Sequence, residues 1–312
     1  MSCYHPYVYV NHYDLSDPIQ RRIFSSIKSK HLGDDDFNRY HQGLFVPREV
    51  AISEGIDLEK NHALLVPCGR CIGCRLDYSR QWAERCIHEA KEHQYNYFLT
   101  LTYDDDHLPI GEKGFATLIE DEVSAFMKRL RKAMKKECGV DNIRFFACGE
   151  YGDGNGDSPD IHVMFRPHYH IILFNCPLPD LQERHPIMVD GKLKMIRQYD
   201  SNGELLLFSP LVHRAWQQRG TAQIGQVTYE SAAYVARYVV KKLYGKDGLA
   251  YSDQGVIPPF VRMSRMPGIG FNWYMTNMKH IYQFDDVYVS ISKKQLHCVF
   301  LKACHNIYQA FE

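Results

Sequence analysis

Residues 166–174 read RPHYHIILF, and this run predicts a buried β-strand that begins at Pro167. Its unusual feature is the pair His168 and His170. Side chains alternate between the two faces of a strand, so both imidazoles share one face, Tyr169 lies on the other, and the pair can bind one metal ion. With 16 histidines in 312 residues, however, an H-x-H triplet is expected by chance about once. The rest of the chain must decide between a metal site and two ordinary strand histidines.

The segments around this strand predict an α+β domain. Runs rich in β-branched and aromatic residues predict strands at 95–103 and 143–150. Periodic apolar residues predict helices at 76–91, 121–136 and 229–244. The order strand, helix, strand, strand, helix favours an antiparallel central sheet flanked by helices. The inward residues predicted for the first two helices are Leu76, Trp82 or Ala83, Cys86, Ile87 and Ala90, then Val123, Phe126, Met127, Leu130 and Met134.

The predicted organisation has one main domain with additions at both ends. Turn signals at Asp190-Gly191 and Asn202-Gly203 predict that its loop-rich insertion forms a hairpin. The predicted parts are an N-terminal arm without an assigned fold (1–65), the main domain (66–275) with its Cys-rich element (68–88) and insertion (177–210), and a C-terminal extension (276–312).

The composition is that of a soluble globular protein. Hydrophobic residues make up 45% and charged residues 24% of the chain, and the net charge is zero, which argues against a general nucleic-acid coat protein. No apolar run approaches the roughly 18–20 residues of a membrane-spanning helix. The N-terminus lacks the basic and apolar regions of a secretory signal, so we expect a cytoplasmic protein with reduced thiols and no membrane partner.

Basic residues are concentrated in two runs. Residues 128–136 hold six basic side chains and residues 237–246 hold four. Such a run is either a solvated helix face or a local surface for phosphates. The candidates for contacts with DNA are Lys128, Arg129, Arg131, Lys132 and Lys242.

The helix predicted at 229–244 carries two tyrosines on its polar face. At about 100° per residue, Tyr234, Tyr238 and Lys241 fall on one side, with Lys242 near them, and the apolar residues fall on the other. Core packing is the usual role of a helical tyrosine, but here the apolar face is complete without them. Because a free phenol is a poor nucleophile at neutral pH, a lysine one turn away is the kind of group that would help.

A carboxylate can join the two histidines from the neighbouring strand. The strand predicted at 143–150 ends in Glu150. If it pairs beside the histidine strand, two imidazoles and one carboxylate can hold a divalent ion and leave positions open for phosphate oxygens. The alternative is a pair of satisfied histidines on a solvated sheet face.

A cysteine cluster forms a second candidate site. Cys68, Cys71 and Cys74 have zinc-like spacing, and the fourth ligand could be Cys86, His88 or a more distant cysteine. Structural zinc is the preferred interpretation and free thiols the main alternative. A redox role fits less well because the pattern has three thiols, and an iron–sulfur cluster would give a coloured protein.

Together these motifs resemble the HUH endonucleases that start rolling-circle replication, most closely the gokushovirus-type initiators of the Microviridae. The resemblance covers about residues 65–275 and rests on several motifs in order. These are PCGRCIGC followed by W-x-x-R (Pro67 to Arg85), FLTLT (98–102), FFACGEYG (145–152), H-Y-H (168–170), YVARYVVKK (234–242) and SRMPGIGFNWY (264–274).

The resemblance implies a fold, a reaction and its participants. The fold is HUH endonuclease-like, with His168, His170 and Glu150 binding Mg²⁺ or Mn²⁺. Tyr234 or Tyr238 attacks the scissile phosphate of single-stranded or replicative-form viral DNA. The attack leaves a 5′-phosphotyrosyl link and a free 3′-OH, which primes a host polymerase, and the displaced strand is later rejoined without ATP. The chain has no G-x4-G-K-[ST] motif, so unwinding falls to a host helicase.

The resemblance implies that Lys241 assists, with Lys242 as the fallback, and it leaves other points open. The run 152–165, GDGNGDSPDIHVMF, separates Glu150 from the histidines by more than the family pattern does. Other candidates for the third ligand are Asp157, Asp160 and His162 within that run and, more weakly, the acidic residues 104–106.

Two other classes of protein compete with this interpretation. One is a non-enzymatic, zinc-dependent nucleic-acid-binding protein with structural histidines. The other is a different HUH nuclease, such as a plasmid initiator, a relaxase or a transposase. Relaxases usually place the tyrosine before the histidine pair, and single-tyrosine transposases are usually shorter.

Overall fold

The structure is a computed structural model that divides into two compact units, Met1–Tyr78 and Ser79–Glu312. Side chains are not described at residues 9–10, 44–46, 238–240 and 286–300. The described residues are 3–10, 44–53, 55, 64–69, 71–152, 166–190, 192–240, 251, 253–281, 286–292 and 295–300.

The larger unit is built on a five-stranded antiparallel sheet. Its strand order is β11-β4-β6-β5-β12, so the histidine strand β6 lies in the middle, hydrogen-bonded on both sides. This confirms the predicted α+β class with an antiparallel central sheet. The strands are β4 (Asn96–Thr102), β5 (Arg144–Tyr151), β6 (Pro167–Phe174), β11 (Ala222–Gln226) and β12 (Phe260–Met263).

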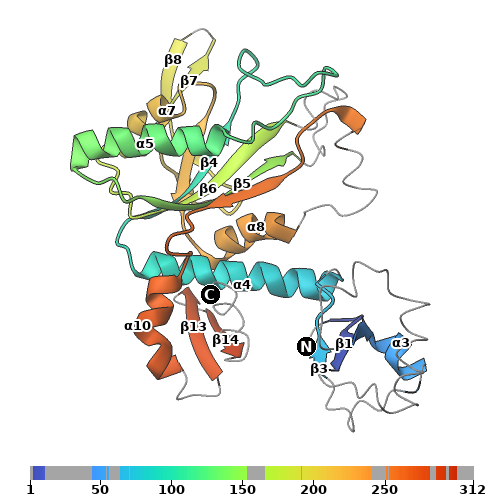
Figure 1. Ribbon diagram of the computed structural model, residues 1–312. Helices are drawn as coiled ribbons and strands as arrows, with labels where there is room; N and C mark the ends of the chain where they lie inside the picture. The colour runs from blue at the N-terminus through green and yellow to red at the C-terminus, as the bar shows by residue number, and fades with distance from the viewer. Residues whose placement is uncertain are drawn as a thin grey trace. The chain divides into compact units, whose positions relative to one another are not determined.

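Helices cover both faces of this sheet. Figure 1 shows α5 on one side of the sheet and α8 on the other. Helix α7 packs beside α5, and the second half of α4 packs beneath α8. The helices are α4 (Ile72–Lys91), α5 (Glu122–Cys138), α7 (Pro210–Ala215), α8 (Tyr229–Val240) and α10 (Phe271–Ile281).

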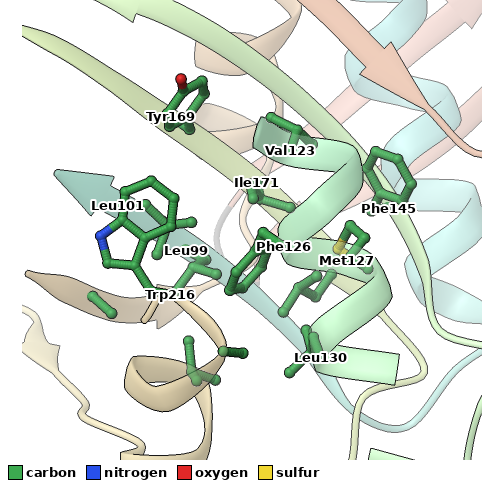
Figure 2. Packing of buried hydrophobic residues seen from close by; sticks show 14 of the residues in the cluster. Leu99, Leu101, Val123, Phe126, Met127, Leu130, Phe145, Tyr169, Ile171 and Trp216 are labelled. Atoms are coloured by element: carbon green, nitrogen blue, oxygen red, sulfur yellow. The ribbon is translucent and has the colours of Figure 1, made fainter. Parts of the chain in front are cut away.

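The main core fills the space between α5 and the sheet (Figure 2). Trp216 is fully buried there and donates a hydrogen bond from Nε1 to the carbonyl oxygen of Thr102, 2.9 Å away. Helix α5 ends where Gly139 adopts the left-handed conformation at φ 71°. All five inward residues predicted for α5 are buried, as its apolar periodicity required; they are Val123, Phe126, Met127, Leu130 and Met134.

A second apolar cluster lies on the face that carries the histidines. Trp82, Cys86 and Ile87 of α4 pack there against strand residues and against the apolar side of α8. The prediction for Leu76 is wrong, because that side chain is 55% exposed in the smaller unit's part of α4. The inward stripe of α4 therefore begins later than its periodicity indicates.

The insertion forms two small antiparallel pairs, which confirms the predicted hairpin. Asp190 has a positive φ of 52° at the end of one strand, and Gly203 has φ 81° in the other turn. Asp200 closes the second turn, accepting hydrogen bonds from the backbone of Asn202 and Glu204. The strands are β7 (His185–Val189), β8 (Lys192–Ile196), β9 (Gln198–Tyr199) and β10 (Leu205–Leu206).

The smaller unit holds a three-stranded antiparallel sheet with the order β2-β1-β3. Its elements are β1 (Tyr7–Val10), β2 (Leu44–Pro47), α3 (Arg48–Ser53) and β3 (Leu64–Val66). Two further strands, β13 (Asp286–Ser292) and β14 (Gln295–Phe300), pair with each other late in the chain. Among the described residues, no helix combines the length and apolar character that a membrane span requires. The predicted domain boundaries stay a prediction.

Acid is expected to destabilise the chain through His88. This side chain of α4 is 2% exposed and stacks on Trp273 of α10, with ring centroids 3.6 Å apart. Burial, assisted by the charge of Lys91, lowers the pKa of His88 from 6.5 to about 3. The unfolded chain therefore binds a proton near pH 6.5 that the folded chain does not, and stability present above that pH is lost as the pH falls toward 3.

Urea titrations between about pH 7.5 and about pH 4.5 measure this loss, which approaches about 1.4 kcal/mol per pH unit from His88 alone. His88→Phe keeps an aromatic ring on Trp273 and should flatten the dependence, whereas His280→Gln, at an exposed position, should not. Equal pH slopes for the wild-type chain and His88→Phe would contradict the assignment.

Candidate active site

The candidate metal ligands meet where two neighbouring strands run side by side. In the register of β5 and β6, Glu150 lies opposite His168, and Cys148 lies opposite His170. Cross-strand partners point to the same face of a sheet, so the carboxylate and both imidazoles share one face. One oxygen of Glu150 and one nitrogen of each histidine lie within 4.8 Å of one another. The structure thus brings together the three residues that the sequence analysis singled out.

Each histidine is oriented through its Nδ1 atom. His168 Nδ1 lies 3.1 Å from the carbonyl oxygen of Arg166. That oxygen can only accept, so a neutral His168 carries its proton on Nδ1. His170 Nδ1 lies 3.0 Å from Oγ1 of Thr100 on β4. Both Nε2 atoms then face Glu150 Oε1, each at 2.9 Å, as expected when neighbouring groups fix the rings of metal-binding histidines.

Two buried atoms at this site fit a cation. Glu150 is 1% exposed, and among the described residues neither its Oε2 atom nor Nε2 of His170 has a hydrogen-bond partner. The approach of His170 to the carboxylate is close but lacks hydrogen-bond geometry. Lone pairs of imidazole and carboxylate repel each other unless a positive charge lies between them. A divalent ion bound by both histidines and Glu150 satisfies these atoms and leaves coordination positions open.

The protonation states also suit a metal ion. Burial raises the pKa of Glu150, but hydrogen bonding to His168 and His170 and their charges outweigh this effect and hold the pKa at about 2. Burial lowers the pKa of His170, and the bond to Glu150 opposes this only in part. At neutral pH the carboxylate is ionised and His170 is neutral, which are the forms that bind metal.

Tyr234 contacts this cluster from helix α8. Its hydroxyl donates a hydrogen bond to Glu150 Oε1 at 2.8 Å, and its ring meets the His170 ring edge-on, with centroids 5.0 Å apart. Helix α8 starts at a reciprocal cap, in which Thr228 and Ser231 each accept a hydrogen bond from the other's backbone N–H. The predicted polar face of this helix is therefore directed, at Tyr234, toward the sheet.

The other residues predicted on this helix are only partly described. Tyr238 belongs to α8, but its side chain lies outside the described residues, as do Lys241 and Lys242 entirely. Sequence reasoning missed Arg237, whose guanidinium carbon lies 5.1 Å from the centroid of the Tyr234 ring. Its position between the two tyrosines in the sequence was the available signal.

A cavity of about 840 Å³ opens beside the cluster. Thr100, His170 and Tyr234 line it on one side and Gln223 of β11 on another, and the β9–β10 turn contributes the rest of the wall. Exposed Arg237 lies at the same cavity. The phenol of Tyr234 and one candidate ligand therefore face a space that a substrate can enter.

The basic run on α5 lies on the opposite face of the sheet. Arg129 is half-buried and donates hydrogen bonds to Glu122 and to the carbonyl oxygen of Ala215, and Arg131 donates to the carbonyl oxygen of Ile143. Lys128 and Lys132 are exposed. The structure does not bring these four residues to the histidines, and their contact with DNA stays a prediction.

The alternative third ligands are separate from the cluster or not described. Asp157, Asp160 and His162 lie outside the described residues. In the acidic run, Asp104 contacts His107 at 2.7 Å and Asp105 contacts Arg166 at 2.5 Å. The position of Glu150 therefore favours it over the 104–106 run.

The cysteine cluster gains a member that the sequence did not single out. Cys3 lies with Cys68, Cys71 and Cys74, and ligand atoms of the four lie within 4.8 Å of one another. Cys86 is not part of this group, because it is fully buried in the second apolar cluster, and His88 stacks on Trp273. The fourth thiol is thus the more distant cysteine that the sequence left as an alternative.

Comparisons with known proteins agree with this placement. A family model for the replication-associated protein ORF2 matches residues 96–243, from the start of β4 to beyond α8. Replication-associated protein ORF2 of Spiroplasma virus 4 is 37% identical over 240 residues, which are 76% of this chain and 66% of that protein. Replication-associated protein VP4 of Bdellovibrio phage phiMH2K is 34% identical over 211 residues, 66% of this chain and 56% of that protein.

A third relative, replication-associated protein ORF4 of Chlamydia phage 1, is 31% identical over 189 residues, 61% of this chain and 41% of its own length. The chain thus spans just under two thirds of the first relative and less of the others. No solved structure matches it. The family match contains Glu150, His168, His170 and Tyr234, and the relatives come from three small phages. The chain belongs to the replication-associated proteins of the Microviridae type.

Proposed function

We propose that this protein initiates rolling-circle replication by nicking the viral-strand origin through tyrosine transesterification. The observation that carries the proposal is the hydrogen bond of 2.8 Å from Tyr234 to Glu150, whose same oxygen lies 2.9 Å from both His168 and His170. A nucleophile thus lies beside a set of residues that suits a divalent ion, in a cavity open to substrate.

The chemistry follows from these positions. Mg²⁺ or Mn²⁺ bound by His168, His170 and Glu150 would supply a Lewis acid for the scissile phosphate. The Tyr234 oxygen forms a bond to phosphorus while the bond from phosphorus to the 3′ oxygen breaks. The phenol gives its proton to water, and the 3′ oxygen takes up a proton to become a free hydroxyl. Glu150 orients the phenol through the bond that it accepts, which reduces the freedom lost on reaching the attacking geometry.

The covalent product explains how the strand is rejoined. A 5′-phosphotyrosyl bond conserves the energy of the phosphodiester, so reversal needs no ATP. Tyr238 lies four residues after Tyr234 on α8, and neighbours at this spacing share a helix face. With two phenols, one holds the displaced strand while the other cuts the regenerated origin. Lys241 and the exposed Arg237 are the candidates to stabilise charge near the phenols.

The proposed partners follow from the reaction. Single-stranded and replicative-form viral DNA are the substrates, and the nucleotide next to the scissile phosphate occupies the cavity beside Tyr234. The free 3′-OH serves a host DNA polymerase, and a host helicase unwinds the duplex. We place the protein in the cytoplasm of the bacterial host.

A covalent adduct tests the proposal. The purified chain is incubated with a set of oligonucleotides that tile the viral strand, with Mn²⁺, and separated by denaturing electrophoresis. We expect an SDS-stable adduct with the oligonucleotide that carries the origin, labelled when the 3′ part of the substrate carries the label. The adduct should disappear with EDTA and should not form on the complementary strand.

Two outcomes separate the competing functions. Binding without any adduct across the whole tiled set would refute the nuclease and favour a non-enzymatic nucleic-acid-binding protein. An adduct that forms but is never transferred to a second origin strand would favour a single-tyrosine HUH nuclease of the relaxase or transposase type over an initiator.

A further inference from the structure

Strand pairing in the smaller unit brings four thiols together. Cys3 precedes β1, and Cys68 and Cys71 follow β3. These two strands are antiparallel, with Tyr7 opposite Val66, so the residues before β1 and after β3 lie at the same end of the sheet. Cys74 joins them from the first turn of α4. The cysteines thus come from three segments, the first of them more than sixty residues away in sequence.

The sulfur positions have the dimensions of a tetrahedral zinc site. Zinc–sulfur bonds of about 2.3 Å at tetrahedral angles place neighbouring sulfurs about 3.8 Å apart. In the structure, Sγ of Cys3 lies 3.8 Å from Sγ of Cys71, and Sγ of Cys68 lies 3.9 Å from Sγ of Cys74. None of the four forms a disulfide. This spacing is too long for an S–S bond and suits four thiolates around one ion.

Backbone N–H groups are directed at these sulfurs. The N–H of Cys68 donates to Cys3 at 3.2 Å, and the N–H of Cys71 donates to Cys68 at 3.3 Å. The N–H of Tyr4 donates to Cys71 at 3.4 Å. Hydrogen bonds of this kind stabilise negative charge on sulfur, and ligand-orienting bonds are a regular feature of metal sites. Three thiols in this environment are prepared to act as thiolates.

The smaller unit has little else to hold it together. Among its described residues the buried apolar side chains are Val8, Ala51 and Cys74. Burying so few side chains stabilises a fold by only a few kcal/mol, and small folds of this kind usually depend on a metal ion or disulfides. A bound ion would contribute the missing free energy by joining the two ends of the unit.

We propose that Cys3, Cys68, Cys71 and Cys74 bind one structural Zn²⁺ that joins the N-terminus to the start of α4 and is required for the smaller unit to fold. The site is distinct from the Glu150–His168–His170 cluster in ligand type and in role, and it takes part in no step of the nicking reaction. Four thiolates close the coordination shell, which is the mark of a structural rather than a catalytic zinc site.

Metal content and cobalt spectra test this proposal on the full chain. The background is the His168→Ala/His170→Ala variant, so that the other candidate metal site contributes nothing. Expressed without added chelator, it should contain about one zinc ion per chain. Replacement by Co²⁺ should give the intense visible bands of a tetrahedral site and thiolate-to-cobalt charge-transfer bands in the near ultraviolet.

Single substitutions then distinguish Cys3 from the sequence-predicted ligand. In the same background, Cys3→Ser should weaken zinc binding, measured by competition with a chromophoric chelator, by more than the roughly 10- to 100-fold cost of losing a second-shell partner. Cys86→Ala should retain the zinc and the cobalt spectrum. The reverse pattern, or equal affinities of Cys3→Ser and the parent, would overturn the assignment of Cys3.

A measurement without cysteine variants protects the test from misfolding. The parent protein is treated with a strong chelator and followed by hydrogen exchange. Amides of β1 and β3 should lose protection and regain it when Zn²⁺ is added, whereas those of β5 and β6 should not change. Protection of β1 and β3 that is unaffected by chelation, a chain without metal, or a coloured protein that contains iron would each overturn the proposal.

Discussion

Tyr234→Phe is expected to abolish the first cleavage, lowering its rate by roughly 10⁴-fold or more, as the loss of a nucleophile does in other covalent enzymes. The substitution removes only the hydroxyl that donates to Glu150 at 2.8 Å. The ring that meets His170 remains, so the packing of α8 is retained. Single-turnover cleavage of origin oligonucleotide with Mn²⁺ measures the effect, and circular dichroism checks the fold.

The matched control is Tyr229→Phe, on the same helix. Tyr229 packs against the second apolar cluster and is no part of the metal-ligand group, so its variant should cleave within a few-fold of the wild-type rate. If Tyr234→Phe cleaves normally and only the double variant with Tyr238→Phe is inactive, the two tyrosines are interchangeable in the first step. If Tyr238→Phe alone is inactive, Tyr234 is not the first nucleophile.

Glu150→Gln is expected to weaken Mn²⁺ binding by at least about 100-fold and to reduce cleavage in parallel, because it removes the only charged ligand of the set. The amide keeps the size of the side chain, and its oxygen can still accept the hydrogen bond from Tyr234. A loss of activity is therefore attributable to the metal rather than to the position of the phenol. Calorimetric titration with Mn²⁺ measures the affinity, and cleavage at increasing Mn²⁺ shows whether excess metal restores the rate.

A second buried carboxylate provides the control for charge loss. Glu122 on α5 is 6% exposed and pairs with Arg129 and Arg219 on the other side of the sheet. Glu122→Gln should lower thermal stability but leave the Mn²⁺ affinity unchanged. If Glu150→Gln also binds Mn²⁺ normally, the third ligand lies elsewhere, and the same titration on Asp157→Asn, Asp160→Asn and His162→Ala identifies it.

The parts of the fold that the sequence predicted well are those that depend on local patterns. The period of 3.6 residues in α5 placed Phe126 and Met127 correctly, and alternation in β6 separated the histidines from Tyr169. The hairpin turns were readable because glycine and aspartate suit their backbone angles. Leu76 was misplaced because periodicity shows which side of a helix is apolar but not where its covering layer ends.

The remaining features depend on pairing between distant segments. Nothing near Cys3 in the sequence links it to Cys68, because the antiparallel pairing of β1 with β3 brings them together. Thr100 was recognised within a motif but not as the partner of His170, since that contact requires the register of β4 against β6. Glu150 was predicted because the end of one strand and the start of the next are usual neighbours.

The ladder between β5 and β6 makes the number of residues between Glu150 and His168 unimportant for the site. Their positions are fixed opposite each other by the strands, and Gly152 N–H still bonds to the carbonyl oxygen of Arg166 at 3.2 Å beyond them. Insertions between those two residues can accumulate without separating the ligands. Sequence searches that demand a fixed interval between the acidic residue and the histidines will therefore overlook such chains, whereas searches that align the two strands independently will retain them.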